Sequence, residues 1–240
     1  MKMNASEADV SRRSFLKKAS VTGTLTAGLG TVADPVAAGS TDTIRVDLWR
    51  GPGVSATAQD QAESAIRDAA SQIGVEASVF PWGETSTSFG DCTSWSCVDD
   101  RFTSNHTLYE GWIATVIAKP NAGAGVAIGS YEENNTPRAY INRHVNGWEG
   151  TRAYKNLVMQ EVLHTLLKDE NAPVSGKEHS FGQQYYDATT SPLLTMYTGI
   201  YNSAPSEACK TDNVEARTGY SKYLSSCTRD EAQRWLDNDY

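Results

Sequence analysis

The segment 151–167 constrains the fold of this chain more than any other. Its apolar side chains occupy most sides of a helix, and a helix of that kind is normally buried. The run WIATVIA at 112–118 comes earlier in the chain and is typical of a buried strand. A buried helix and a buried strand require a layered structure with a shared core. The sequence therefore predicts an α+β domain in which a twisted sheet packs against this helix.

The other elements follow from hydrophobic periodicity and turn residues. The segment 83–105 is polar and rich in Ser and Thr, so we expect a long loop there. Beyond residue 167 the chain is irregular and polar until a final helix at 229–236, where Thr228 and Glu231 form a capping box. The remaining predictions are strands at 43–48, 75–80, 126–131 and 138–145, and a helix at 56–73 that ends at Gly74.

The first 38 residues are predicted to be a twin-arginine export signal. Arg12 and Arg13 lie in a basic stretch, a weakly apolar run covers 19–33, and 36–38 offers small residues for cleavage. The run is too short and too rich in Gly and Thr to span a membrane. A disordered basic tail is the alternative. Because the twin-arginine pathway carries folded proteins, a metal ion can be loaded before export.

Removal of the signal leaves a strongly acidic mature chain. Residues 39–240 number 202, with 16 basic and 26 acidic side chains and a net charge of −10. A negative surface disfavours nucleic acids and anionic membranes as partners. Few lysines, many aspartates and a twin-arginine signal resemble the secreted, halophilic proteins of salt-loving archaea. An ordinary acidic secreted protein fits the composition equally well.

All four cysteines lie in the exported part, and an even number outside the cell favours two disulfides. We expect the close pairs, Cys92 with Cys97 and Cys209 with Cys227, among three possible connectivities. A metal knuckle is the weaker alternative, because the spacing within both pairs is loose for zinc.

The helix at 151–167 carries the side chains with the clearest chemistry. Glu161 and His164 match all but the first position of the zinc signature H-E-x-x-H, where this chain has Gln160. Positions 160 and 164 lie one turn apart on one helix face, so both side chains can reach one ion. Glu161 lies beside them and can take a proton from water.

The order of elements and this motif together resemble the zincin zinc metallopeptidases, and within them the metzincins. The segment 191–197, SPLLTMY, is similar to the Met-turn of that branch, with Met196 under the metal and Tyr197 directly behind it. The resemblance covers most of 43–200, but its specific motifs amount to about a dozen residues. It implies a zincin-like, mixed but mostly parallel sheet, an N-terminal lobe at about 43–167 and a C-terminal lobe at about 168–240.

This chain departs from the metzincin pattern at two places. Gln160 replaces a histidine, and a carboxamide oxygen is a poorer zinc ligand than imidazole. The tail of the motif is also missing, because TLLK follows His164 without the expected Gly or His. The next histidine is His179, which we expect as a ligand, with Asp169 and Glu170 as weaker candidates.

The resemblance implies an exported hydrolase that cleaves peptide bonds. In this interpretation, His164 and His179 ligate Zn²⁺, Gln160 is a weak or water-bridged third ligand, and Glu161 is the general base. The strand at 126–131 pairs with an extended peptide or protein substrate. No nucleic-acid partner and no membrane span of the mature chain are expected.

Two other interpretations stay open. In one, the chain is a degenerate zincin that binds peptides or serves as a surface interaction module without catalysis. In the other, it is an unrelated disulfide-stapled domain in which Glu161 forms a salt bridge with Arg138 or Arg143. Two further histidines are set aside, because His106 belongs to a glycosylation sequon on a surface loop and His144 lies too far along the chain. The chain has no nucleophile elbow and no phosphate-binding loop.

Overall fold

The computed structural model describes residues 43–128, 136–143, 151–167, 171–173, 178–185, 189–194, 209–211 and 219–236. The predicted signal at 1–38 lies outside the described residues. The described part holds a mixed α/β structure with a mostly parallel sheet and four α-helices, which agrees with the α+β prediction.

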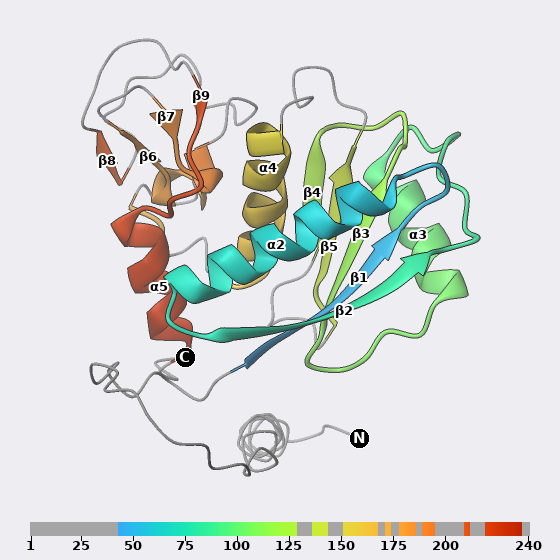
Figure 1. Ribbon diagram of the computed structural model, residues 1–240, viewed down its shortest axis with the longest axis horizontal. Coiled ribbons are helices and arrows are strands. Elements are labelled where there is room, and N and C mark those ends of the chain that lie inside the picture. The colour runs from blue at the N-terminus through green and yellow to red at the C-terminus, as the bar shows by residue number, and fades with distance from the viewer. Residues whose placement is uncertain are drawn as a thin grey trace, which may run out of the picture.

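The main sheet has five strands in the order β2-β1-β3-β5-β4 (Figure 1). Neighbouring strands are parallel except for β4, which runs antiparallel to β5 at one edge. The strand predicted at 126–131 is therefore an edge strand, which is the position that the sequence interpretation requires of it. The strands are β1 (Thr43–Arg50), β2 (Glu76–Glu84), β3 (Ile113–Ala118), β4 (Gly125–Ile128) and β5 (Arg138–Asn142).

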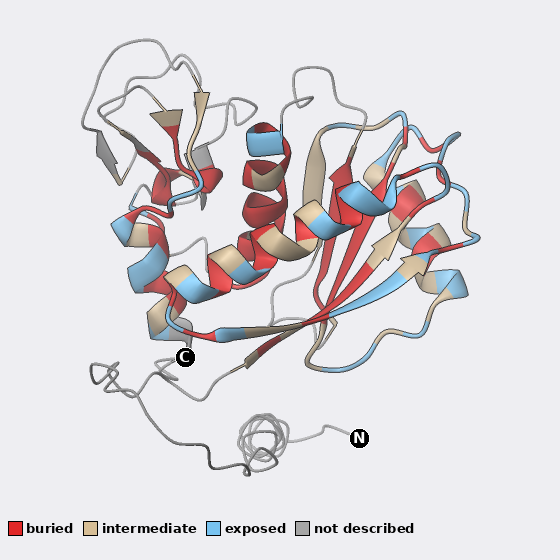
Figure 2. Ribbon diagram, viewed as in Figure 1, coloured by how far each residue is buried: buried red, intermediate tan, exposed pale blue. Residues whose placement is uncertain are grey.

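Helices cover both faces of this sheet. Helices α2 (Ala56–Gln72) and α4 (Thr151–His164) pack on one face and against each other, and they share the larger apolar core. Helix α3 (Trp95–Asn105) covers part of the opposite face over a second, smaller core. Figure 2 shows α4 buried along most of its length, as its sequence predicts. Gly74, with φ of 81°, ends α2 as predicted.

The prediction of a long loop at 83–105 is wrong, because the second half of this segment is helix α3. Ser94 caps this helix by accepting a hydrogen bond from the Cys97 amide at 3.3 Å. Val98 and Phe102 lie one turn apart, are fully buried and pack against the sheet. Burial of this small apolar face decides the structure here, although the segment is polar in composition.

Several other element boundaries differ from the sequence prediction; strand β1 continues to Arg50 and β2 to Glu84. Strand β5 ends at Asn142, and α4 ends at His164, where the Thr165 side chain bonds back to the carbonyl of Val162 at 2.7 Å. Helix α5 (Ser226–Leu236) begins three residues early. The predicted capping box is wrong, since Ser225 Oγ accepts from the Thr228 amide at 3.0 Å.

The described C-terminal residues form a small second sheet with the order β8-β6-β7-β9. Each of its strands has only two residues, and they lie on the side of α4 away from the main sheet (Figure 1). The strands are β6 (Gln183–Gln184), β7 (Thr189–Thr190), β8 (Lys210–Thr211) and β9 (Gly219–Tyr220). Two 3-10 helices lie in the same region, η2 (Glu178–Phe181) before β6 and η3 (Pro192–Leu194) after β7.

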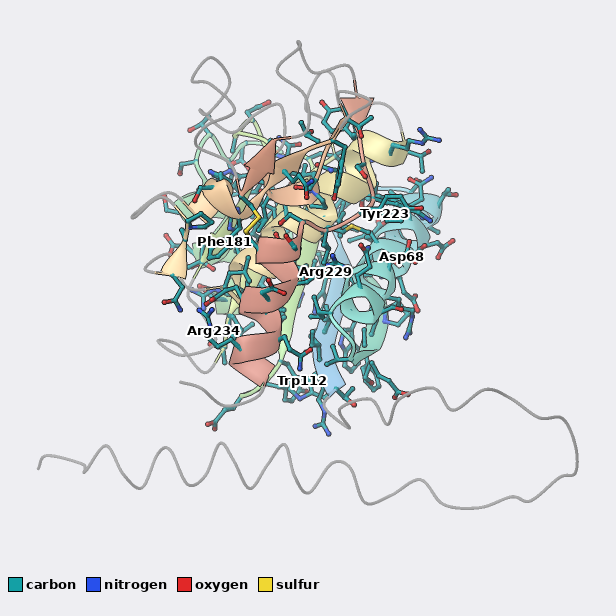
Figure 3. The ribbon with its side chains drawn as sticks, turned by 90° about the vertical axis from the view of Figure 1, so that its left-hand side faces the viewer. Asp68, Trp112, Phe181, Tyr223, Arg229 and Arg234 are labelled. Carbon is teal, nitrogen blue, oxygen red and sulfur yellow. A yellow bond between two sulfur atoms is a disulfide. The ribbon has the colours of Figure 1, made fainter. Side chains whose placement is uncertain are left out.

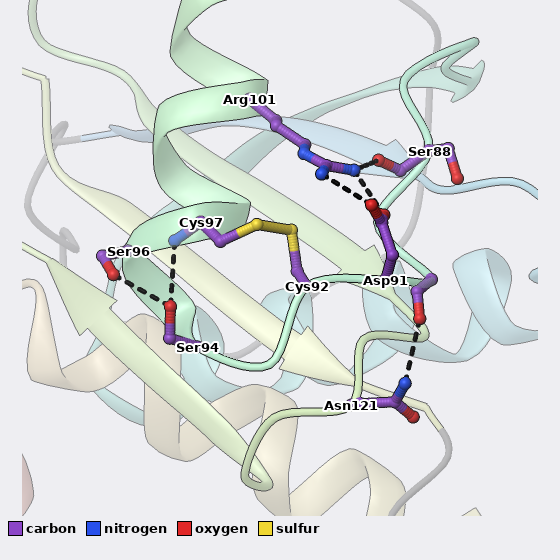
Figure 4. The surroundings of a disulfide bond; sticks show 9 residues. Ser88, Asp91, Cys92, Ser94, Ser96, Cys97, Arg101 and Asn121 are labelled. Carbon is purple, nitrogen blue, oxygen red and sulfur yellow. Dashed lines mark hydrogen bonds and ion pairs between the residues drawn. A yellow bond between two sulfur atoms is a disulfide. The ribbon is translucent and has the colours of Figure 1, made fainter.

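Both predicted disulfides, Cys92–Cys97 and Cys209–Cys227, are present, and no cysteine is free. Figure 4 shows the first bridge at the start of α3, next to the Ser94 cap and the ion pair of Arg101 with Asp91. Two disulfides are typical of an oxidising compartment. In the part of the chain that the structure describes, no helix has the length and apolar character needed to cross a membrane.

Candidate functional site

Helix α4 presents Gln160 and His164 from consecutive turns near its C-terminal end. The helix is held against α2 by the buried Tyr154, whose hydroxyl donates to the carbonyl of Ala58 at 3.0 Å. Burial raises the pKa of Tyr154 well above its usual range, so this hydroxyl remains a donor. Gln160 is 7% exposed, whereas His164 is only half-buried. The site therefore lies where the buried helix reaches the surface.

His179 meets His164 from the other side of the site. It lies on η2, and the two Nε2 atoms are 3.2 Å apart. The rings are nearly perpendicular, with an interplanar angle of 81° and centroids 4.9 Å apart. Fourteen residues separate these histidines in the sequence, and the tertiary structure brings them together.

The position of η2 is set by its neighbours in the C-terminal region. Phe181 is buried, and its carbonyl accepts hydrogen bonds from the hydroxyls of Ser225 and Thr228 at the start of α5. Figure 3 shows Phe181 beside α5, on which Arg229 is labelled. The next residue, Gly182, accepts a hydrogen bond from the Cys209 amide at 3.0 Å. His179 is thus anchored through backbone groups close to the second disulfide.

Gln160 completes a group of three side chains. Its Nε2 lies 3.5 Å from Nε2 of His179 and 3.4 Å from Oε1 of Glu161. Its Oε1 is buried, and no residue that the structure describes donates a hydrogen bond to it. A half-turn of the carboxamide would present the oxygen to the imidazoles, at the cost of the hydrogen bond from Nε2 to the Glu161 carboxylate. A buried acceptor without a donor costs stability, so a ligand for it is expected.

Glu161 points from α4 toward the edge strand β4. Its side chain is 4% exposed and lies against Gly125, the first residue of that strand. The alternative salt bridge to Arg138 is wrong, because Arg138 Nε pairs with Asp99 Oδ1 at 2.6 Å. Arg143 lies over the ring of Tyr154 with its guanidinium carbon 4.7 Å from the ring centroid.

The two histidines are spaced as two nitrogen ligands of one zinc ion would be. Zinc binds imidazole nitrogen at 2.0–2.1 Å in tetrahedral geometry, which places two ligand nitrogens about 3.3 Å apart. The observed separation of the two Nε2 atoms is 3.2 Å. Among the described residues there is no group of three or more His, Cys, Asp and Glu side chains that could hold a metal. Of the described side chains, the carboxamide of Gln160 lies next to His179, with 3.5 Å between the two Nε2 atoms.

Several predicted site residues lie outside the described residues, namely Met196, Tyr197, Asp169, Glu170 and His144. Just before Met196, η3 packs against both α4 and η2. His106 follows α3 at the start of the next loop, as expected from the sequence, and is half-buried there. Its Nε2 lies 2.8 Å from Thr85 Oγ1, and its ring stacks on Phe102.

Sequence reasoning missed two residues next to the site. Gly125 lies just before the strand predicted at 126–131, and Asn142 ends β5 without a recognised motif. The Asn142 side chain donates to the carbonyls of Ala122 at 2.9 Å and Gly123 at 3.1 Å, which fixes the turn before β4. An asparagine at a strand end is a weak signal, because its partner carbonyls are known only from the fold.

A scan against protein-family models finds none that matches this sequence. A search of curated proteins finds no match either.

Proposed function

We propose that this protein is an exported zinc metallopeptidase with a zincin-like fold and a weakened metal site. The observation that carries the proposal is the meeting of His164 and His179 at 3.2 Å beside the buried carboxamide of Gln160. The mostly parallel sheet with an antiparallel edge strand and a buried helix behind it supports the zincin-like assignment.

His164, His179 and Gln160 hold the metal in this proposal. When bound, zinc polarises a peptide carbonyl and makes water more acidic. The Glu161 carboxylate accepts the proton of the attacking water, because it is the acidic side chain adjacent to Gln160 on the same helix. Its burial limits competing contacts with solvent and keeps the carboxylate near the ligands.

The edge strand β4 supports a peptide substrate. Its pairing with β5 uses one side of the strand, and in the order of the main sheet no strand follows it on the other side. An extended peptide can add to such an edge through backbone hydrogen bonds. Glu161 lies against the first residue of this strand, so the base and the substrate-pairing edge are neighbours.

A second function is favoured by Gln160 itself. A carboxamide in place of imidazole weakens zinc binding, and the described residues supply no third His, Cys, Asp or Glu. The alternative is a non-catalytic protein that binds extended peptides along β4 on the same fold. Zinc affinity separates the two functions.

The deciding experiment is a calorimetric zinc titration of mature wild-type protein and Gln160→His. The substitution adds a third imidazole at a position that already faces His179, so zinc affinity rises by at least about 10–100-fold. Gln61→His, which adds a histidine to α2, is the control and leaves affinity unchanged. Failure of both wild type and Gln160→His to bind zinc contradicts the metallopeptidase proposal, whereas tight binding by wild type means that another residue completes the site.

Peptide turnover by the zinc-loaded Gln160→His protein then tests catalysis. Adding Glu161→Gln to that variant keeps the metal but abolishes turnover, because the proton acceptor is gone. Zinc binding without turnover in Gln160→His favours the peptide-binding alternative.

Export is tested separately. Replacing both Arg12 and Arg13 with Lys traps the precursor inside the cell if the twin-arginine pathway is used. Cleavage after Ala38 is checked by N-terminal sequencing of the secreted protein. Normal secretion of the Lys variant refutes this assignment.

A further inference from the structure

The backbone at Gly125 is fixed before β4 begins. The Asn142 amide donates to the carbonyl of Ala124 at 2.8 Å, and Gly125 pairs with Ile141 of β5. Asn142 is 2% exposed, and its side chain holds the preceding turn by further hydrogen bonds to backbone carbonyls. Gly125 therefore has little freedom to move away from the helix that faces it.

The space next to Gly125 is occupied by Glu161. A Cβ atom at position 125 would lie 2.6 Å from Oε1, 2.7 Å from Cδ and 2.7 Å from Cγ of Glu161. Side-chain atoms do not approach a Cβ this closely, so any residue other than glycine displaces the carboxylate or the strand. The φ angle of Gly125 is not in the left-handed region, so the backbone conformation does not require glycine. Only the contact with Glu161 requires it.

We propose that Gly125 is a positioning residue for Glu161. Because Gly125 has no side chain, the Glu161 carboxylate can lie directly against the backbone of the edge strand; we call this space the seat for Glu161. The catalytic meaning of this seat rests on the proposed function, in which Glu161 is the base and β4 pairs with the substrate. One glycine then sets the distance between the proton acceptor and a peptide bound along that strand.

The contact itself is tested by a double-mutant cycle on thermal stability, which needs no activity. Gly125→Ala lowers the Tm because the new methyl group collides with Glu161. Glu161→Ala in the Gly125→Ala background removes the colliding atoms and recovers most of that loss, so the two substitutions are strongly non-additive. Additive shifts in Tm overturn the proposal. If Gly125→Ala alone does not fold, we expect the double variant with Glu161→Ala to fold. If neither variant folds, the proposal is also overturned.

Gly123→Ala is the matched control two residues earlier. A Cβ at position 123 has its nearest neighbour at 3.7 Å, the Nε1 atom of Trp95, which is an ordinary contact. This variant keeps the wild-type Tm, and its effect adds to that of Glu161→Ala. The same double-mutant cycle is measured for Gly123→Ala and Glu161→Ala. If its coupling energy equals that of the Gly125 cycle, the contact is not specific to Gly125 and the proposal is overturned.

The catalytic role is read from kinetics in the zinc-loaded Gln160→His background. Gly125→Ala lowers kcat by about 100-fold, the effect of a misplacement of about 1 Å, while KM and zinc affinity stay unchanged. An unchanged kcat overturns the positioning role. If no variant cleaves peptide but the stability cycle shows coupling, the proposed function has failed while the seat for Glu161 stands.

Discussion

The two sheets of this protein are stabilised in different ways. The main sheet has strands of four to nine residues, and its core is built from apolar side chains that recur with strand or helix periodicity. The small C-terminal sheet has strands of two residues. The segments around it reach the same core through single apolar side chains such as Phe181, Leu193 and Leu224, and polar contacts and one disulfide add to this. A repeated pattern thus specifies the first region, and particular pairs of groups specify the second.

The contacts of the C-terminal region show this reliance on single groups. Asn156 of α4 donates to the carbonyls of Thr190 at 3.3 Å and Ser221 at 2.9 Å. Gln72 at the end of α2 donates to the carbonyl of Lys222 at 2.9 Å and accepts from the amide of Leu224 at 2.8 Å. Buried backbone groups must be paired, and here two long-range side chains pair them.

The candidate site lies where these regions meet. His164 belongs to the helix that completes the large core, whereas His179 belongs to the region held by separate contacts. Changes in the first region should therefore lower the stability of the whole chain. Under the proposed function, changes in the second should mainly alter the position of His179 and the affinity for zinc.

The largest expected effect comes from matched leucines that are both fully buried, Leu48 on β1 and Leu193 on η3. Leu48→Ala costs about 3–5 kcal/mol of unfolding free energy, because the dense core cannot fill the cavity. Leu193→Ala costs about 2–3 kcal/mol, the lower end of the range, and weakens zinc binding more than Leu48→Ala. Urea unfolding and calorimetry measure both effects. An equal loss of stability without a change in zinc affinity contradicts the distinction between the regions.

The two disulfides give the next largest difference. The bridge Cys209–Cys227 has a sequence separation of 18 and Cys92–Cys97 one of 5. Replacing both cysteines of a pair with Ala costs about 3 kcal/mol for the longer loop and about 2 kcal/mol for the shorter one. Thermal unfolding of the two double variants measures the order. A greater loss from the shorter loop means that loop closure does not govern the C-terminal region.

A pair of asparagines probes the polar contacts. Asn156→Ala costs about 2 kcal/mol and leaves two carbonyls in the C-terminal region without a donor. Asn142→Ala has a similar cost but acts on the turn before β4. Hydrogen exchange measured by segment should rise at 189–194 and 219–225 in the first variant and at 120–125 in the second. Uniform exchange across the chain in both variants contradicts local control.

The smallest expected effect concerns two helix caps. Ser55 accepts a hydrogen bond from the Ala58 amide at 3.2 Å, and Ser55→Ala costs about 1 kcal/mol. Ser225→Ala costs more, because Ser225 both caps α5 and donates to the carbonyl of Phe181 near His179. Only Ser225→Ala should change zinc affinity. Equal effects of both variants on stability and zinc affinity contradict this second role of Ser225.

The sequence predicted the main sheet well because its signals are local. Periodicity placed all five strands and helices α2 and α4, and Gly74 marked the end of α2. The even number and close spacing of the cysteines also predicted both disulfide pairs. Helix α3 was missed, because only Val98 and Phe102 supply its buried face and the many Ser and Thr residues dominated the pattern.

The sequence by itself determined that Gln160 and His164 lie one turn apart on one buried helix with Glu161 beside them, which makes them the candidate site residues. Only the tertiary structure decided that His179 meets His164 and that Glu161 lies on Gly125. The physical reason is the distance along the sequence between the residues in contact. Helical spacing fixes neighbours three or four residues apart, but contacts across fourteen or more residues depend on how turns, polar contacts and a disulfide fold the chain back.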